Sequence, residues 1–183
     1  SGFEAHVGGS RIDVARAGAI KIIDAQSTVS IRTRGARDEF APRTGGAEAK
    51  TLGGVERLEV RGNQLEQSWT FSSRPTSRIL SLNVDVDVAG PIEPRGSSFA
   101  LGKSGVVYGA ATWVDAKGVR SPVDARVVGH SIELYADFTG MGKHYGPFPD
   151  SSSFRIALGD LASNDIRKRL KAVWEDPLSL DPA

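Results

Sequence analysis

The residues best able to do chemistry are few and scattered along this 183-residue chain. Histidine occurs at His6, His130 and His144, with spacings that match no metal-binding motif. There is no HExxH, GxSxG or Walker pattern and no GxGxxG opening a helix after a strand. Cysteine is absent, which excludes disulfides, thiolate metal sites and a cysteine nucleophile. We therefore expect no metal site, no cofactor and no identifiable catalytic residue.

Three polar residues at alternate positions resemble a calcium loop only superficially. Asn83, Asp85 and Asp87 follow an Asn-x-Asp-x-Asp pattern within an alternating apolar run. On a strand, residues two apart lie about 6.6 Å apart, at about 3.3 Å per residue. Calcium ligands, which bind at about 2.4 Å from the ion, must converge more closely than that. The pattern is typical of a solvent-facing strand whose charges discourage edge pairing.

Aromatic residues are the remaining candidates for a ligand-binding site. Trp69 and Phe71 share one face of a strand with Leu65, which predicts that they belong to the core. Trp113 lies among small residues just before a turn, and we expect it to be half exposed. An irregular segment, TGMGKHYGPFPDSSS, holds further aromatic and basic side chains. The candidate ligand-binding residues are therefore Lys143, His144, Tyr145, Phe148 and Trp113.

The irregular segment Thr139–Ser153 is the predicted recognition loop. Its glycines permit tight turns, and Pro147 and Pro149 fix the backbone on either side of Phe148. Two residues are enough to close a hairpin, so the extra length suggests a role beyond connection. Binding residues favour loops held on a rigid scaffold. The opposing interpretation is that Tyr145 and Phe148 only anchor the loop.

The elements that position these residues are predicted to be short strands. The clearest alternating run is Leu80–Val88. Glycine-containing links such as Gly62-Asn63 and Gly129-His130 indicate hairpins. The long polar stretch 35–54, by contrast, is predicted to be a mobile loop. Strands are expected at Gly2–Val7, Arg11–Val14, Ala19–Asp24, Thr28–Arg34, Val55–Arg61, Gln64–Ser72, Leu80–Val88, Val106–Val114, Val123–Val128, Ser131–Phe138 and Phe154–Leu158.

About ten short strands without alternating helices predict an all-β fold, an antiparallel sandwich with a barrel as the alternative. One short helix is expected near the C-terminus. Asn164 can cap it, and apolar residues recur at helical spacing from Ile166 to Trp174 before Pro177 ends it. We expect one domain over residues 1–176, with two sub-sheets dividing near 55–64 as an alternative, and a linker or tail over 177–183.

Composition limits the class of partner. The net charge of +1 gives no field for capturing nucleic acid or an anionic membrane. No apolar run approaches the roughly 20 residues of a membrane-spanning helix. The expected partners are therefore a protein or glycan ligand and other domains of the same larger chain, with no nucleic acid and no membrane span.

About half of the chain, residues 55–138, resembles a known kind of domain. The segment Leu65-Glu66-Gln67-Ser68-Trp69-Thr70-Phe71 followed by Arg74-Pro75, the strand Leu80–Val88 and the run from Val106 to Val123 resemble N-terminal β-domains of large secreted bacterial proteins. Such domains commonly precede FG-GAP (integrin-α-like) or similar repeats. The resemblance implies a secreted or cell-surface protein and transfers no catalytic residue. After Phe138 the sequence departs from that pattern, which puts a repeat-bearing neighbour in doubt.

The sequence thus predicts a non-catalytic recognition or structural module of an exported bacterial protein. One alternative is a carbohydrate-binding domain that stacks sugars on Trp113, Tyr145 and Phe148. Another is a polysaccharide hydrolase or lyase that uses His144 or His130 with a carboxylate such as Asp137.

Overall fold

The computed structural model describes residues 2–51, 54–71, 79–114, 120–137 and 152–160. These residues form fifteen strands in two antiparallel sheets and contain no helix. Sheet A holds, in spatial order, β1 (Phe3–Val7), β2 (Ser10–Val14), β3 (Ile20–Ile23), β4 (Thr28–Thr33), β9 (Ile79–Asp87) and β14 (Ser131–Asp137). Sheet B holds β12 (Val106–Val114), β15 (Ser152–Asp160), β8 (Gln64–Phe71), β7 (Gly54–Arg61), β6 (Gly46–Thr51) and β5 (Ala41–Arg43), with the hairpin of β10 (Ile92–Arg95) and β11 (Ser98–Leu101) beside β12.

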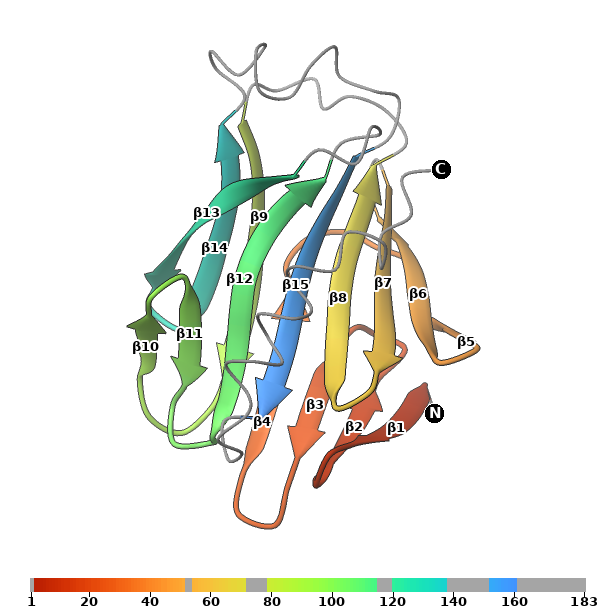
Figure 1. Ribbon diagram of the computed structural model, residues 1–183. Helices are drawn as coiled ribbons and strands as arrows, with labels where there is room; N and C mark the ends of the chain where they lie inside the picture. Colours follow the sequence, from red (N-terminus) through yellow and green to blue (C-terminus); the bar gives the residue numbers. More distant parts are fainter. Residues whose placement is uncertain (1, 52–53, 72–78, 115–119, 138–151, 161–183) are drawn as a thin grey trace.

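One strand, β13 (Arg120–Val128), belongs to both sheets. Its first part pairs with β12, ending at Val123 opposite Ala111. Its second part pairs with β14, from Asp124 opposite Tyr135 onward. A strand that changes sheets makes a corner of a sandwich. Figure 1 shows the result, with β12, β15, β8 and β7 in one layer and the strands of sheet A in the other. The predicted all-β sandwich is confirmed, and the sheets do not close into a barrel.

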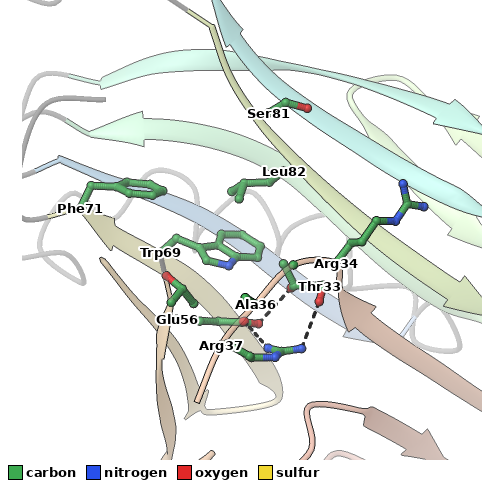
Figure 2. Close-up of a pocket in the computed structure, with 11 residues that line it drawn as sticks. Thr33, Arg34, Ala36, Arg37, Glu56, Trp69, Phe71, Ser81 and Leu82 are labelled. Carbon is green, nitrogen blue, oxygen red and sulfur yellow. Dashed lines mark hydrogen bonds and ion pairs between the residues drawn. The ribbon is translucent and has the colours of Figure 1, made fainter. Parts of the chain in front are cut away.

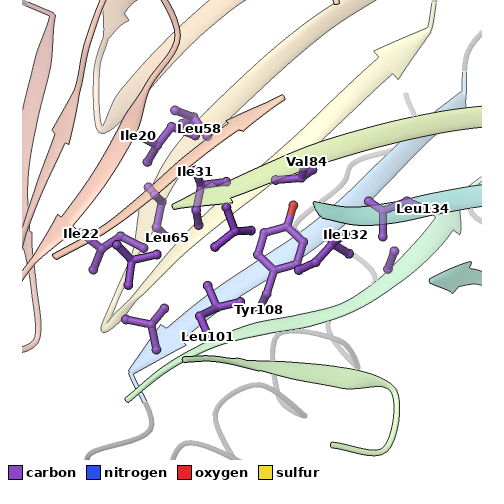
Figure 3. Packing of buried hydrophobic residues seen from close by; sticks show 14 of the residues in the cluster. Ile20, Ile22, Ile31, Leu58, Leu65, Val84, Leu101, Tyr108, Ile132 and Leu134 are labelled. Atoms are coloured by element: carbon purple, nitrogen blue, oxygen red, sulfur yellow. The ribbon is translucent and has the colours of Figure 1, made fainter. Parts of the chain in front are cut away.

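The core fills the space between the two sheets (Figure 3). Strand alternation points every second residue inward, as the sequence predicts: Val84 and Val86 of β9 are buried, whereas Asp87 is exposed. Trp69 and Phe71 are buried, which confirms them as core residues. The largest fully buried side chains are Trp69, Trp113, Tyr108, Phe40, Ile12, Ile20, Ile31, Leu58 and Leu65.

The stretch 35–54 is not one long loop, and that prediction is wrong. It contains β5 and β6, which pair with each other around Gly45 (φ 74°). The inward residues of β6 are Ala47 and Ala49, so a buried strand leaves little hydrophobic signal in the sequence. Gly46 lies so close to β7 that an added Cβ would meet the Leu58 carbonyl oxygen at 1.8 Å. The glycine is therefore required by strand packing, not by mobility.

The two strands that flank the predicted recognition loop do not form a hairpin. β14 pairs with β9 and β13, whereas β15 lies between β8 and β12. Residues 138–151 therefore connect one sheet to the other, and a two-residue link would not replace them. The premise that two residues would suffice is wrong, because alternation locates a strand without identifying its neighbours.

Some sequence predictions fall outside the described residues. These are the helix expected near 164–175, the tail 177–183 and the turn at Asp115–Gly118. The hairpins at Gly62 (φ 57°) and Gly129 (φ 60°) are confirmed. The sequence prediction omitted the short β10–β11 hairpin, whose first strand contains Pro94. In the part of the chain that the structure describes, no helix is long and apolar enough to cross a membrane.

Candidate functional site

A pocket of about 250 Å³ opens between the two sheets (Figure 2). Sheet A contributes the last residue of β4 and the start of β9, and sheet B contributes inward residues of β7 and β8. The connection that leaves β4 covers one side. The lining residues are Thr33, Arg34, Gly35, Ala36, Arg37, Thr51, Glu56, Trp69, Phe71, Ser81 and Leu82.

The pocket has a buried floor and an exposed rim. Thr33, Glu56, Trp69 and Phe71 are buried. The rim is exposed along the connection 34–36 and at Ser81. Because the floor residues sit on paired strands of both sheets, their positions are fixed by the sheet ladders rather than by loop conformation. Strands of both sheets therefore hold the floor of the cavity in place.

A buried polar network lies under the pocket. Thr33 Oγ1 donates to Glu56 Oε1 at 3.0 Å, and Gln67 Nε2 donates to the same oxygen at 2.7 Å. The Tyr108 hydroxyl donates to Gln67 Oε1 at 2.7 Å. The Arg37 guanidinium donates to Glu56 Oε2. This chain of partners joins both sheets, and each buried polar group in it is satisfied, as burial requires.

Arg37 also ties down the connection between β4 and β5. Its Nη2 donates to the backbone carbonyls of Gly18 and Thr33, each at 3.2 Å. The guanidinium lies 4.9 Å from the centroid of the Phe40 ring, a cation–π distance. One buried side chain thus links the β2–β3 hairpin, the end of β4 and the inward carboxylate of β7.

The electrostatics of the network favour structure over proton transfer. Burial raises the pKa of Glu56 above its ordinary value, and the opposing charge of Arg37 is the largest influence that lowers it. Burial likewise raises the pKa of Tyr108. Glu56 already accepts three hydrogen bonds, so it has little capacity left to act as a general base.

One buried donor in the pocket is unsatisfied. Among the described residues, no acceptor lies within hydrogen-bonding distance of Trp69 Nε1, although the residue is only 1% exposed. Trp69 lies directly opposite Glu56 in the β7–β8 ladder, so both side chains share the inward face. In Figure 2 the indole lies between Phe71 and the Arg37–Glu56 pair. A buried, unpaired N–H is costly to stability.

Trp113 lies elsewhere than the sequence predicts. It is 0% exposed, with its ring stacked on Phe71 at a centroid distance of 6.3 Å. The expectation of a half-exposed Trp113 is therefore wrong, and in this fold the ring offers no platform for a sugar. Small neighbours in β12 leave room for the indole inside the sandwich instead of opening it to solvent. The other four candidates, Lys143, His144, Tyr145 and Phe148, lie outside the described residues.

The histidine and carboxylate candidates do not assemble in the described structure. His6 and His130 are exposed. His130 precedes β14 and Asp137 ends it, so about 23 Å of strand separates them. His144 lies outside the described residues. Within the described part of the chain, no group of three His, Cys, Asp or Glu side chains could hold a metal ion.

The polar residues of β9 lie on the outer side of sheet A, as predicted, but β9 is not an edge strand, because it pairs with both β4 and β14. Asp85 accepts hydrogen bonds from Arg34 Nη2 at 2.5 Å and from the Ser131 hydroxyl at 2.6 Å. Both partners come from neighbouring strands or their ends, and all three lie on the outer side of sheet A. The contacts with Arg34 and Ser131 hold the pKa of Asp85 below its ordinary value. The Asp85 carboxylate thus belongs to a hydrogen-bonded ion pair on the surface of sheet A.

Sequence reasoning missed the polar network, although the sequence contains a sign of it. Gln67 stands between Leu65 and Trp69 on the face that the alternation assigns to the core, and Glu56 precedes Leu58 in the same way. A polar residue on a predicted inward face requires a buried partner. Nothing local identifies Arg37 as that partner, because it lies 19 positions before Glu56 in an irregular connection.

Comparison with protein-family models, with curated proteins and with solved structures finds no match to this chain.

Proposed function

We propose that the protein is a non-catalytic recognition module of an exported bacterial protein, and that the pocket between β4, β7, β8 and β9 receives one group of its ligand. The observation that carries this proposal is the cavity of about 250 Å³ between the two sheets, whose floor residues lie on paired strands. Ligand sites are concave, mostly apolar and fitted with a few convergent polar groups. This pocket has each of those features, although its volume of about 250 Å³ lies just below the usual range of about 300–1,000 Å³.

A binding role accounts for the chemistry of the floor better than catalysis does. A general base needs a free lone pair near the operating pH, whereas Glu56 is enclosed by Arg37, Gln67 and Thr33. The described residues also bring no histidine to the pocket. The apolar part of the lining comes from Phe71, Leu82 and Trp69 instead. The arrangement supports selection by shape.

The exported setting rests on the resemblance of residues 55–138 to N-terminal β-domains of large secreted bacterial proteins. Two of the segments that carry the resemblance form β8 and β12, which flank β15 in the middle of sheet B. In such a setting the remaining partners would be other domains of the same chain. The recognition loop Thr139–Ser153 stays a second candidate surface, because its residues up to Ser151 lie outside the described structure.

The pocket can be tested with two simple probes. We would titrate toluene and methyl β-D-glucopyranoside into ¹⁵N-labelled protein and follow the indole N–H resonance of Trp69. Because the lining is mostly carbon, toluene is expected to shift that resonance to saturation and the glucoside to leave it unchanged. A shift with the glucoside alone would favour a carbohydrate-binding domain. No shift with either probe would refute the pocket as a binding site.

A rim substitution supplies the control. Ala36→Trp places a large ring at the exposed mouth and should abolish the toluene response with little change in stability. Ala25→Trp, in the exposed turn before β4, should leave the response intact. The two sites lie at opposite ends of β4, about 20 Å apart for six residues of strand. Equal effects from both variants would mean that toluene binds outside the pocket.

A further inference from the structure

We propose that residues 161–183 of this chain dock on the outer face of sheet B, with the apolar side of the helix predicted at 164–175 lying over Val107. The outer face is the side of β12, β15 and β8 that points away from sheet A (Figure 1). This contact goes beyond the proposed function, because the pocket lies on the inner side of the same strands. Three observations support it: the burial of outward side chains, the position where β15 ends, and the distribution of charge.

Three buried apolar residues do not belong to the core. Ala100, Val107 and Val114 are 5%, 1% and 3% exposed, yet none of them is a member of the cluster that fills the space between the sheets. Residues next to them in sequence, such as Tyr108 and Trp113, are members of that cluster. Since successive side chains on a strand point to opposite faces, the three residues face outward from sheet B. An antiparallel sheet that packs on one face commonly exposes the other face to water, so their burial requires a cover.

The neighbours of Val107 are too small to shield it. Val107 lies opposite Ala100 of β11 and Gly159 of β15. Neither residue has a side chain larger than a methyl group. Along the chain, the residues two positions away are Gly105 and Gly109, which add no side chain. An exposure of only 1% therefore means that another part of the molecule lies over Val107.

The covered area continues onto β8. Gln64, Glu66 and Ser68 are 3%, 1% and 3% exposed, although they alternate with the inward residues Leu65 and Gln67. Sheet A differs, because in its strands every buried residue that the structure describes points inward. Among the described residues, a covered outer face is therefore a property of sheet B.

The end of β15 lies beside this covered area. β15 ends at Asp160, which is opposite Val106 and directly follows the glycine opposite Val107. Residues 161–183 therefore begin next to Val107. The other segments outside the described residues that adjoin sheet B join it at the far end, about 23 Å away along β12. These segments are 52–53, 72–78, 115–119 and 138–151.

The sequence of the segment suits such a surface. A helix of twelve residues over 164–175 is about 18 Å long. The covered row runs from Ala100 in β11 to Gln64 in β8, across β12 and β15, and four adjacent strands span about 14 Å. The helix is therefore long enough to cover the row. Its apolar side consists of Ile166, Leu170, Val173 and Trp174.

The charges of the two surfaces are complementary. Glu59 and Glu66 lie opposite each other in the β7–β8 ladder. Arg61 approaches both carboxylates, at 3.2 Å and 3.7 Å. Like charges that lie directly opposite are destabilising, so two neighbouring carboxylates favour a further cation. The stretch 164–175 contains two acidic and four basic residues, the latter being Arg167, Lys168, Arg169 and Lys171.

The absence of cysteine makes the cover measurable. Val107→Cys places the only thiol of the chain on the covered face, whereas Val128→Cys places it at a position that is 52% exposed. Each full-length variant is reacted with N-ethylmaleimide, and its rate is divided by the rate of the same variant in urea to remove differences in intrinsic thiol reactivity. The thiol of Val107→Cys should react at least about tenfold more slowly, because the reagent reaches it only through local opening. Equal rates would show that the face is open and would refute the proposal.

A second substitution identifies what lies on the face. Leu170→Glu places a charge on the apolar side of the predicted helix and should raise the rate of Val107→Cys toward that of Val128→Cys. Lys168→Glu, on the opposite side of the helix, is the matched control and should leave the thiol protected. The inward thiol of Ala111→Cys should stay protected in both backgrounds if the sandwich remains folded. If Val107→Cys stays protected with Leu170→Glu, another segment covers the face and the proposal is wrong.

A distance measurement decides the matter even if Leu170→Glu unfolds the protein. A nitroxide attached to Lys168→Cys leaves the apolar side of the helix unchanged and broadens amide resonances steeply with proximity. It should broaden the resonances of Gln64 and Val107 more than that of Lys21, which is exposed on the outer face of sheet A. Equal broadening, or none at Gln64 and Val107, would overturn the proposal. Because the pocket is tested by its own probes, either result leaves the proposed function to be judged separately.

Discussion

Replacing Arg37 with methionine removes the positive charge from a buried ion pair while keeping most of the aliphatic stem. The Arg37 side chain is 7% exposed and that of Glu56 is 0% exposed. Glu56 would keep its hydrogen bonds to Thr33 and Gln67 but lose the charge that compensates its burial. The connection between β4 and β5 would lose its contacts to Gly18 and to the carbonyl of Thr33.

The expected loss of unfolding free energy is about 3–5 kcal/mol at neutral or higher pH, the usual cost of removing one partner of a buried pair. Loss of the two carbonyl contacts and the cation–π contact with Phe40 places the estimate in the upper half of that range. Methionine fills much of the space of the arginine stem, so a cavity adds little. Most of the effect is therefore electrostatic.

Its pH dependence follows from the pKa of Glu56. Burial raises that pKa above the ordinary value of 4.5, and Arg37 is the main opposing influence. Without Arg37 the pKa of Glu56 rises further. Between 4.5 and the folded pKa the folded state holds a proton that the unfolded state has released, so stability falls as pH rises through this window. Arg37→Met should therefore be less destabilising at about pH 5 than at about pH 8.

Urea unfolding at both pH values, followed by tryptophan fluorescence, measures these effects. Arg34→Met is a matched control from the same connection, because Arg34 pairs with Asp85 at the surface. Its unfolding midpoint should hardly change. The double variant Arg37→Met with Glu56→Gln removes both charges and should be more stable at about pH 8 than Arg37→Met alone. It should also lose most of the pH dependence.

Three results would refute this reasoning. A loss below about 1 kcal/mol at pH 8 would mean that water or another group compensates Glu56, which contradicts its burial. Equal losses at pH 5 and pH 8 would mean that Glu56 does not titrate in this window. An Arg34→Met variant as unstable as Arg37→Met would mean that the connection, rather than the ion pair, determines the effect.

Three further predictions concern stability. Trp69→Ala should lower the unfolding free energy by about 3–5 kcal/mol in urea titrations, the usual range for a buried large aromatic; a loss below about 1 kcal/mol would contradict its burial. Asp24 Oδ1 accepts hydrogen bonds from the backbone N–H groups of Gln26 and Ser27, each at 2.7 Å. These bonds hold the pKa of Asp24 below 3.8, and the bond from Gln26 has the largest effect. That stabilisation is present above pH 3.8 and is lost as pH falls through the folded pKa. Asp24→Ala should therefore lower the melting temperature at pH 7 and reduce the difference in melting temperature between pH 7 and about pH 2.5. An unchanged difference would contradict this prediction. Dialysis against a chelator should leave the melting temperature unchanged, because Asp85 is held by Arg34 and Ser131; a rise of several degrees on adding calcium would overturn that prediction.

The sequence by itself determined the class of the fold and the direction of most strand residues. Alternation is a local property, since successive side chains on a strand point to opposite faces whatever the strand pairs with. It therefore assigned Val84, Val86, Leu65 and Trp69 to the core, as the structure confirms. Hairpins closed by glycine, as at Gly62, were readable for the same reason, because the turn and both strands are adjacent in the chain.

Local pattern failed where the inward residues are small. Ala47 and Ala49 of β6 carry little hydrophobic contrast, so the sequence pattern predicts a loop where this strand lies. The prediction that Trp113 is half exposed failed for a different reason. Its small neighbours in β12 suggest exposure, but whether the space around an indole is open or filled depends on strands that are not adjacent in the chain. Phe71 of β8, in the same sheet, stacks on the indole here.

Only the tertiary structure decided which strands are neighbours and where a pocket forms. The position of β15 between β8 and β12 and the change of sheet by β13 depend on contacts between segments far apart in the chain. The same holds for the pairing of Arg37 with Glu56 across 19 positions and of Tyr108 with Gln67 across 41. A sequence shows which polar residues are placed on an inward face. Their partners are fixed only when the two sheets pack, because a buried charge selects its counterion by proximity in space and not by spacing along the chain.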